Sequence, residues 1–275
     1  MSTIALVQLR SGASVAANLE QVEYWIAQAR NQFPCELVVL PENFAFVGQY
    51  ETDKCNIAED FGDGPIQDFL MQMSKKYRVW LVGGTLPLKT ANPQKIRAAC
   101  LVYDDQGVCK ARYDKMHLFD VQVGHQEIYN ESATIDLGDK PVVVDTPIGC
   151  IGLSVCYDLR FPSLYRHLVE LGAEIFTVPA AFTAKTGEAH WEVLLRARAI
   201  ENLAYVLAPN QAGLHPNSRQ TYGHSMFVDP WGRVLQQLQQ MPGICVHTID
   251  LEYLRQIRKE FPCNQHHRFG VSYDK

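Results

Sequence analysis

The sequence predicts an α/β fold in which two mixed β-sheets pack face to face, with helices on their outer sides. Short apolar runs of strand length alternate with longer segments of helical periodicity along the whole chain. Both hairpin and strand–helix–strand patterns occur, so the sheets should mix antiparallel and parallel pairs. The 275 residues contain no linker, low-complexity tract or repeat. We therefore expect one domain that spans residues 1–275.

The first half of the chain alternates strand-like and helix-like segments. Apolar side chains from Leu19 to Ala29 recur at helical spacing, and Pro41 closes the second apolar run. A turn that ends in Gly107 favours a hairpin between the apolar runs on either side of it. The expected strands are residues 4–9, 37–40, 79–82, 99–103 and 108–113, and the expected helices are residues 15–32 and 69–77.

The second half repeats this alternation. Pro162 suits the first turn of a helix, and Gly172 suits its end. Residues 187–204 carry apolar side chains nearly all round the expected helix, which predicts that this helix is well buried. The expected strands are residues 141–144, 148–155, 175–178, 205–208, 225–228, 233–235 and 244–248, and the expected helices are residues 162–171, 187–204 and 251–259.

The composition favours a globular protein whose partner is a small molecule. Hydrophobic residues make up 47% and charged residues 20% of the chain, which is typical of folded domains. The net charge is −5 and there is no basic run, which disfavours nucleic acid or an anionic membrane as a partner. Gln8 and Arg10 interrupt the apolar N-terminus, and no run approaches the roughly 20 apolar residues of a membrane span. We expect a cytoplasmic protein.

The eight cysteines predict neither a disulfide framework nor a zinc ribbon, because no two of them have C-x-x-C spacing. Most are expected to be buried, reduced thiols. Cys263, His266 and His267 could form a metal site, but adjacent histidines point in different directions on most backbones. A solvated C-terminal tail is therefore the favoured interpretation. We expect no metal and no cofactor.

Three polar residues stand just past the ends of expected strands: Glu42, Lys115 and Cys156. Reactive groups gather at the carboxyl ends of strands in open α/β sheets, so these three are expected to face one crevice. Each has an ordinary interpretation as well, since capping or salt-bridged glutamates, surface lysines and buried thiols are common. The combination is more specific than its members, because hydrolysis of an amide uses all three side-chain types.

Amide hydrolysis needs a nucleophile, a proton carrier and a group that stabilises the oxyanion. Cys156 would supply the nucleophile, and the helix expected near Pro162 would favour its thiolate through the helix dipole. Glu42 would accept the thiol proton, pass it to the leaving amine and then activate water. Lys115 and the backbone N–H of Tyr157 would stabilise the oxyanion, and the loss of one such donor typically costs about 3 kcal/mol.

At these residues the sequence resembles the nitrilase superfamily. The similarity lies in three segments in the family's chain order: residues 40–43 (LPEN), 113–120 (YDKMHLFD) and 152–162 (GLSVCYDLRFP). The resemblance implies a four-layer α-β-β-α sandwich and a Glu42–Lys115–Cys156 triad. It also implies a second pocket glutamate, which is Glu131 in the segment 129–132 (YNES), expected to orient Lys115. Dimers are common in the family, so a homodimer or larger homo-oligomer is implied.

Within the superfamily the sequence is most similar to the deaminated glutathione amidase branch. The segments behind this are 116–121 (MHLFDV), 181–183 (AFT), 186–187 (TG), 190–192 (HWE), 222–226 (YGHSM) and 229–232 (DPWG). The resemblance implies hydrolysis of the amide of a small 2-oxo acid to the acid and ammonia through a cysteine thioester, as metabolite repair. An ω-amidase acting on 2-oxoglutaramate or 2-oxosuccinamate, or an N-carbamoyl amino acid hydrolase, would use the same triad.

A substrate with carboxylates needs a cation and hydrogen-bond donors around it. Arg160 is placed for a bidentate clamp beyond Cys156, and Thr183 and Thr186 could donate hydroxyls. An ion pair of Arg160 with Asp158, and simple loop capping by the threonines, are the alternatives. Two other functions use the same residues: a thiol redox sensor based on Cys156, and a catalytically silent scaffold. The sensor is disfavoured, because no resolving cysteine lies at short spacing.

Overall fold

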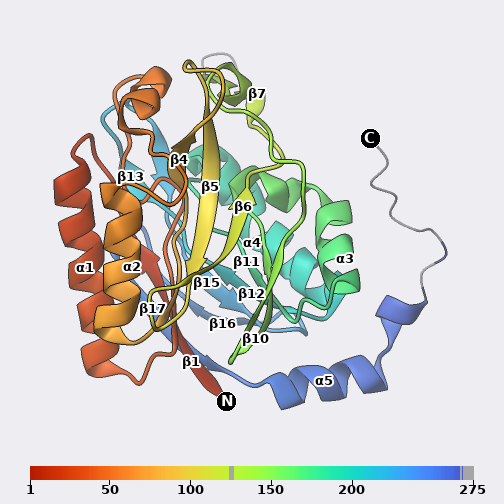
Figure 1. The fold of residues 1–275 in the computed structure, drawn as a ribbon. Helices are drawn as coiled ribbons and strands as arrows, with labels where there is room; N and C mark the ends of the chain where they lie inside the picture. The colour runs from red at the N-terminus through yellow and green to blue at the C-terminus, as the bar shows by residue number, and fades with distance from the viewer. Residues whose placement is uncertain (124–126, 267, 269–275) are drawn as a thin grey trace.

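The computed structural model describes residues 1–123, 127–266 and 268, and two sheets form its centre (Figure 1). The first sheet has the strand order β17-β1-β2-β3-β5-β4, with β6 paired to β5. The second has the order β16-β15-β12-β11-β10-β9. The strands of the first sheet are β1 (Ser2–Gln8), β2 (Leu37–Val39), β3 (Trp80–Val82), β4 (Leu86–Lys89), β5 (Ile96–Tyr103), β6 (Cys109–Asp114) and β17 (Gly243–Ile249).

The second sheet and two separate hairpins complete the strands. The strands of the second sheet are β9 (Val143–Thr146), β10 (Gly149–Leu153), β11 (Ile175–Thr177), β12 (Tyr205–Ala208), β15 (Met226–Val228) and β16 (Val234–Gln237). The hairpins are β7 (Asp120–Val123) with β8 (Glu127–Asn130), and β13 (Ala212–Leu214) with β14 (Gln220–Tyr222).

Helices cover the outer side of each sheet. They are α1 (Val15–Gln32), α2 (Pro65–Tyr77), α3 (Pro162–Glu170), α4 (Ala184–Asn202) and α5 (Leu251–Glu260), and the 3-10 turns are η1 (Glu51–Ile57), η2 (Glu131–Ala133), η3 (Cys156–Arg160) and η4 (Cys263–Gln265). In Figure 1, α1 and α2 lie on one side of the two sheets, and α3 and α4 lie on the other. The expected four-layer α-β-β-α sandwich is confirmed.

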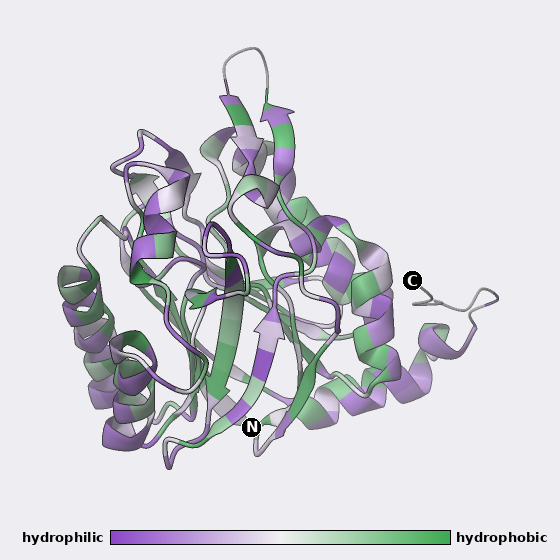
Figure 2. Cartoon of the chain, turned by 45° about the horizontal axis from the view of Figure 1, so that its top comes forward, coloured by the Kyte–Doolittle hydropathy of each residue, from purple (hydrophilic) through white to green (hydrophobic). Residues whose placement is uncertain are grey.

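Two apolar cores hold these layers together. One lies between the first sheet and helices α1 and α2, and includes Val22, Ile26 and Leu70. The larger core fills the space between the sheets and continues under α3 and α4, where Trp191 is fully buried. Figure 2 shows the same division, with hydrophobic strands inside and helices whose outer sides are hydrophilic. Removal of this apolar surface from water is the main force that holds the sheets face to face.

The parallel strands determine where loops can carry function. β1, β2 and β3 run parallel in one sheet, and β10, β11 and β12 run parallel in the other. In each sheet the carboxyl ends of these parallel strands therefore lie at the same edge. The loops that follow β2 and β10 can meet there. β6 brings a third loop to the same place, because it pairs with β5. The fold thus gathers three loops that are distant in sequence.

The structure corrects the sequence-based elements in two respects. β4 and the two separate hairpins were not expected, and α2 begins at Pro65, earlier than predicted. The expectation that the helix after residue 187 is buried nearly all round is wrong, since Val193 is 66% and Ile200 is 48% exposed. One side of α4 packs on the core, while its outward side mixes Val193 and Ile200 with charged residues such as Glu192 and Arg196.

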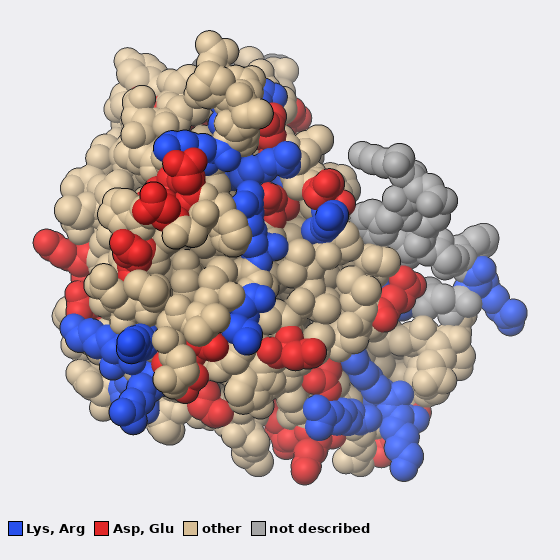
Figure 3. Space-filling view, in the orientation of Figure 1, with Lys and Arg blue, Asp and Glu red and all other residues tan. Residues whose placement is uncertain are grey.

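On the face drawn in Figure 3, basic and acidic side chains lie next to one another. Among the residues that the structure describes, no helix has the length and apolar character needed to cross a membrane.

Candidate active site

Glu42 lies just after β2, in a segment whose backbone passes very close to Gly84 and Thr85. Asn43 adopts a left-handed conformation (φ +56°), and its N–H donates to the Thr85 hydroxyl at 2.8 Å. Gly84 also has a positive φ of +54°, and a Cβ there would lie 2.0 Å from the Pro41 carbonyl oxygen. Only glycine fits at this position, since any side chain would collide with the backbone that carries Glu42.

Lys115 links the two glutamates that the sequence predicted. Its Nζ lies 2.8 Å from Glu42 Oε1 and 2.8 Å from each carboxylate oxygen of Glu131. The side chains are 1%, 4% and 14% exposed for Lys115, Glu42 and Glu131 respectively. A buried ammonium between two carboxylates has its donors satisfied and its orientation fixed.

Cys156 sits at a strained turn directly after β10. Its φ is +46°, in the left-handed region that non-glycine residues rarely adopt. The N–H of Cys156 donates to the Pro179 carbonyl at 2.9 Å, and Asp158 accepts the Val155 N–H at 2.8 Å. Such strain persists only where the surroundings enforce it, so these bonds hold the sulfur at a fixed position.

The carboxylate of Glu42 is held on its other side by backbone. The Ala181 N–H donates to Glu42 Oε2 at 2.8 Å, and Gln211 Nε2 donates to the Glu42 carbonyl at 2.9 Å. The Cys156 thiol lines the same cavity as Glu42, and the two groups are near enough for the carboxylate to raise the pKa of the thiol. The structure therefore brings Glu42, Lys115 and Cys156, predicted from three separate sequence segments, to one cavity.

The charges of these groups follow from burial and from their neighbours. Burial by itself would raise the pKa of Glu42, but the Lys115 ammonium and, more weakly, Arg219 together lower it below the usual value. Burial alone would lower the pKa of Lys115, but Glu131 and Glu42 raise it above the usual value. The resting site thus holds a carboxylate and an ammonium at neutral pH.

The thiol of Cys156 behaves differently from the sequence-based expectation. Burial and the Glu42 carboxylate raise its pKa far above the ordinary value, although Lys115 lowers it in part. The expected thiolate, stabilised by a helix dipole, is wrong for the free enzyme. A 3-10 turn, η3, separates Cys156 from the start of α3, so Cys156 does not lie in the first turn of that helix, where the effect of the dipole is concentrated.

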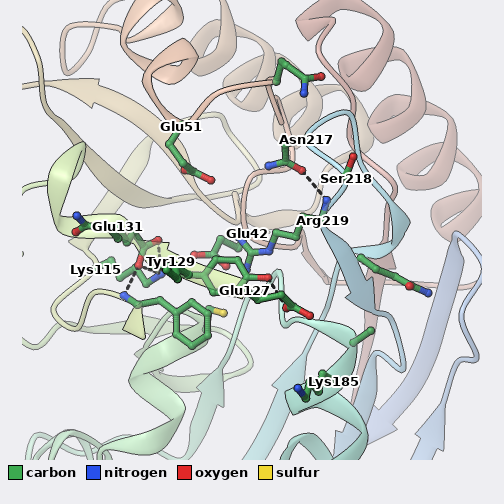
Figure 4. A pocket seen from close by; sticks show the side chains of 17 residues that line it. Glu42, Glu51, Lys115, Glu127, Tyr129, Glu131, Lys185, Asn217, Ser218 and Arg219 are labelled. Carbon is green, nitrogen blue, oxygen red and sulfur yellow. Dashed lines mark hydrogen bonds and ion pairs between the residues drawn. The ribbon is translucent and has the colours of Figure 1, made fainter. Parts of the chain in front are cut away.

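A cavity of about 640 Å³ opens above these groups. Lys115, Glu42, Glu131 and Cys156 line it, together with charged and polar residues from four other segments (Figure 4). Those further residues include Glu51, Glu127, Tyr129, Lys185, Asn217 and Arg219. The sequence analysis missed them, because a charged residue in a short loop has the same pattern whether it faces a cavity or bulk solvent.

The four expected substrate-binding residues lie near Cys156 but in different environments. Tyr157, Thr183 and Thr186 line a small pocket beside the Cys156 sulfur. The two threonine hydroxyls are 2.7 Å apart and hydrogen-bond to each other. Arg160 lines neither this pocket nor the large cavity in the described residues. Its guanidinium lies over the rings of Phe182 and Tyr157, and its Nη1 is 3.3 Å from a ring nitrogen of His190.

Metal-ligating side chains are not clustered in the described part of the chain. No group of three or more His, Cys, Asp or Glu residues there could hold a metal ion. Cys263 and His266 are described, whereas His267, the third member of the cluster considered from the sequence, lies outside the described residues. All eight cysteines are free.

Comparison with known proteins agrees with this geometry. The family model for carbon-nitrogen hydrolases matches residues 3–259. A Yersinia enterocolitica protein named deaminated glutathione amidase is 44% identical over 278 residues, covering 98% of this chain and 94% of the relative.

Two solved structures are also similar. The NitFhit protein of Caenorhabditis elegans has a TM-score of 0.92 and 38% identity, and the match covers 98% of this chain but 66% of that longer one. Saccharomyces cerevisiae Nit3, described as a member of the nitrilase superfamily, has a TM-score of 0.88 and 31% identity, covering 98% and 97%. The chain therefore belongs to the carbon-nitrogen hydrolase family, within the nitrilase superfamily.

Proposed function

We propose that this hydrolase is an amidase that cleaves the amide of a small 2-oxo acid, such as deaminated glutathione, through a thioester on Cys156. The observation that carries the proposal is the contact of Lys115 with Glu42 and Glu131 at 2.8 Å, next to the Cys156 thiol in one cavity. The choice of substrate is supported by the name of the Yersinia relative, with which the chain shares 44% identity.

The first half of the reaction forms the thioester. At rest Cys156 is a thiol and Glu42 is a carboxylate, because the pKa of the first is raised and that of the second is lowered. Glu42 is therefore free to accept the thiol proton, and this transfer is completed as the sulfur attacks the amide carbon. The carbonyl oxygen becomes an oxyanion, which the Lys115 ammonium and the Tyr157 N–H stabilise. The C–N bond then breaks, and Glu42 returns the proton to the leaving amine.

The second half releases the acid. Glu42, again a carboxylate, takes a proton from water, whose oxygen attacks the thioester carbon. The same cation stabilises the second oxyanion, the C–S bond breaks, and the proton on Glu42 goes to the departing sulfur. Glu131 contributes by holding the Lys115 ammonium in place throughout.

The amine released depends on the substrate, which refines the expectation of ammonia. Ammonia leaves from a primary amide such as 2-oxoglutaramate. In deaminated glutathione the amide nitrogen belongs to the cysteine of cysteinylglycine, so that dipeptide is the leaving amine. A cavity of about 640 Å³ is in the usual range for small-molecule sites and can accept the longer leaving group.

We also propose substrate-contact roles for Tyr157, Arg160, Thr183 and Thr186. The pocket beside Cys156 that includes Tyr157 and the two threonines supports contacts with atoms next to the scissile amide. Arg160 would reach a substrate carboxylate after movement of its side chain from the ring of Phe182. These roles are tested by the same substrate panel as the main proposal.

The proposal also includes a single domain, a cytoplasmic location and a homo-oligomeric state. Pairing of β1 with β17 supports one domain over residues 1–275. Eight free cysteines suit the reducing cytoplasm. Several large apolar side chains are exposed, which supports a homo-oligomer that covers them; among them are Leu171, Val193, Ile200, Trp231 and Phe261.

The main test is product analysis on a panel of amides with the purified protein. Mass spectrometry should detect cysteinylglycine and 2-oxoglutarate from deaminated glutathione, and ammonia assays should detect turnover of 2-oxoglutaramate as the ω-amidase alternative. An N-carbamoyl amino acid and a simple nitrile complete the panel. Turnover of either of these without turnover of the two 2-oxo acids would contradict the substrate assignment.

A second measurement tests the covalent step. Cys156→Ala should abolish turnover, whereas Cys150→Ala, in β10 outside the cavity, is the matched control. Acid-quenched protein should carry an acyl adduct on the peptide that contains Cys156. Comparable activity of Cys156→Ala would exclude the thioester, and a disulfide without any turnover would favour the redox sensor.

A further inference from the structure

Arg219 is a cation of the active-site cavity that lacks an acidic partner. Its Nη2 donates to the Ala181 carbonyl at 2.6 Å, while its Nε is buried and has no hydrogen-bond partner. Within the described residues, the ion pairs formed by arginines involve Arg112, Arg196, Arg198 and Arg255 and do not include Arg219. A buried donor without a partner is costly unless a ligand satisfies it.

The other charged groups of the cavity are either committed to partners or exposed. Lys115 is held by two carboxylates, and Glu51 pairs with Lys54 at 2.9 Å. Lys185, in the first turn of α4, is exposed at the edge of the cavity. Glu42 and Glu51 are near enough to raise the pKa of Arg219, but neither pairs with it directly. Arg219 thus differs from Lys115, which is held by direct ion pairs, and from Lys185, which is exposed.

The arginine is held in place before any ligand arrives. Arg219 is the last residue of the β13–β14 turn. Its N–H donates to Asn217 Oδ1 at 3.1 Å, and its carbonyl accepts the His215 N–H at 2.9 Å. The ring of His215 is buried, and its two nitrogens form hydrogen bonds with the Ser11 carbonyl and the Thr221 hydroxyl. A guanidinium fixed in this way loses little conformational entropy on binding.

Aromatic contact fixes the direction of the guanidinium. It lies 5.2 Å from the centre of the Tyr129 ring, and Tyr129 is itself bonded to Glu127 at 2.9 Å. Figure 4 shows Arg219 extending from its loop towards Glu42, across the space that Tyr129 borders. Arg219 also lines the small pocket beside Cys156, so its charge is directed at the place where substrate must lie.

We propose that Arg219 binds a carboxylate of the substrate and thereby selects acidic amides over neutral ones. This inference rests on the proposed function and names a specificity residue for it. Guanidinium and carboxylate match in shape and charge, and the pair is strong where water is scarce. Deaminated glutathione offers two carboxylates: one on the 2-oxo acid, on the acyl side of the amide, and one on glycine, on the leaving side.

The test compares acidic substrates with neutral analogues of the same shape. In 4-oxopentanamide a methyl group replaces the carboxylate of 2-oxoglutaramate, and in the glycinamide of deaminated glutathione an amide replaces the leaving-side carboxylate. Arg219→Gln should lower kcat/KM for an acidic substrate by about 10- to 100-fold, mainly through KM, and should affect the matching neutral analogue much less. Arg219→Lys keeps the charge and should retain part of the preference.

The pattern of loss identifies the carboxylate. A selective loss with 2-oxoglutaramate assigns the acyl-side group, and a selective loss with deaminated glutathione relative to its glycinamide assigns the leaving-side group. Equal loss on acidic and neutral amides would overturn the proposal, since Arg219 would then act only by bracing Ala181, whose N–H holds Glu42. A preference that is lost in Arg160→Gln but kept in Arg219→Gln would overturn it as well.

Binding measurements separate this inference from the proposed function. Calorimetry with the Cys156→Ala protein needs no turnover, and folding of each variant is checked by thermal unfolding. Replacement of Arg219 by Gln in that background should weaken binding of 2-oxoglutaramate or deaminated glutathione by at least about tenfold. Equal binding with and without Arg219, or no binding of either compound, would overturn the assignment, whatever amide the wild-type enzyme hydrolyses.

Discussion

The hydroxyl of Tyr113 donates a hydrogen bond of 2.7 Å to the carboxylate of Asp158, and both side chains are buried. Tyr113 lies in β6 just before Lys115, and Asp158 lies in the turn that begins at Cys156. The bond therefore joins the strand that leads to Lys115 to the turn that begins at Cys156. Burial and Asp158 raise the pKa of Tyr113 well above its usual value, so the phenol remains a neutral donor.

Tyr113→Phe should weaken this connection. The substitution leaves one Asp158 oxygen without its phenol donor, which should lower the free energy of unfolding by about 1–3 kcal/mol. It should also lower kcat/KM, because the turn that holds Cys156 loses a fixed contact. Urea unfolding and steady-state kinetics measure the two effects. Tyr24→Phe, on a ring that is 54% exposed, is the control, and equal behaviour of the two variants would contradict this role of Tyr113.

Gly84→Ala tests how closely the backbone approaches Glu42. An alanine there must adopt a left-handed conformation, and its Cβ would meet the Pro41 carbonyl oxygen at 2.0 Å. We expect a loss of more than about 2 kcal/mol in unfolding free energy and a large fall in kcat, since the loop before Glu42 must move. Gly12→Ala is the matched control, because a Cβ at Gly12 meets no atom within 4 Å. Full activity of Gly84→Ala would show that this loop does not position the carboxylate.

Glu131→Gln tests the positioning of Lys115. The amide keeps the size of the side chain but removes the charge that holds the ammonium at 2.8 Å. We expect kcat to fall by at least about tenfold with little change in KM, because the oxyanion is stabilised less in the transition state. The control is Glu127→Gln, because Glu127 lines the same cavity without contacting Lys115. This substitution should lower kcat far less. Similar losses in both variants would argue against a specific role of Glu131.

The raised pKa of Cys156 predicts a distinctive pH dependence of alkylation. Because the folded-state pKa lies far above the ordinary value, the thiolate fraction is small at neutral pH and grows about tenfold per pH unit. The rate of iodoacetamide labelling of the Cys156 peptide should therefore keep rising to at least about pH 9. The same peptide in urea should level off near its usual pKa, about 8.5. A plateau below about pH 7 in the native protein would indicate a preformed thiolate.

Periodic segments were the part of the fold that the sequence predicted well. Helix α1 has the expected bounds of Val15 and Gln32, since a capping Ser14 and one apolar face define it locally. Strand β12 likewise has the expected bounds of Tyr205 and Ala208. Short strands in hairpins were missed. β13 and β14 are each three residues long, and a run of that length has too few positions to show a period.

The sequence by itself predicted which side chains would carry the proposed chemistry. Glu42, Lys115 and Cys156 each follow a strand whose apolar run is visible in the sequence, so their places at strand ends were predictable. The resemblance to the nitrilase superfamily added Glu131 as a second glutamate of the pocket. Local pattern and motif order were sufficient, because strand ends are fixed by a few neighbouring residues.

The tertiary structure decided the charges, the strain and the further cavity residues. Burial raises the pKa of Cys156, and the clash of a Cβ with Pro41 makes Gly84 necessary. Arg219 lines the pocket beside Cys156 only because its hairpin packs there, where Arg219 contacts the Tyr129 ring and the Ala181 carbonyl. Desolvation and long-range contact depend on which segments pack together in three dimensions, and no local pattern around Arg219 encodes that.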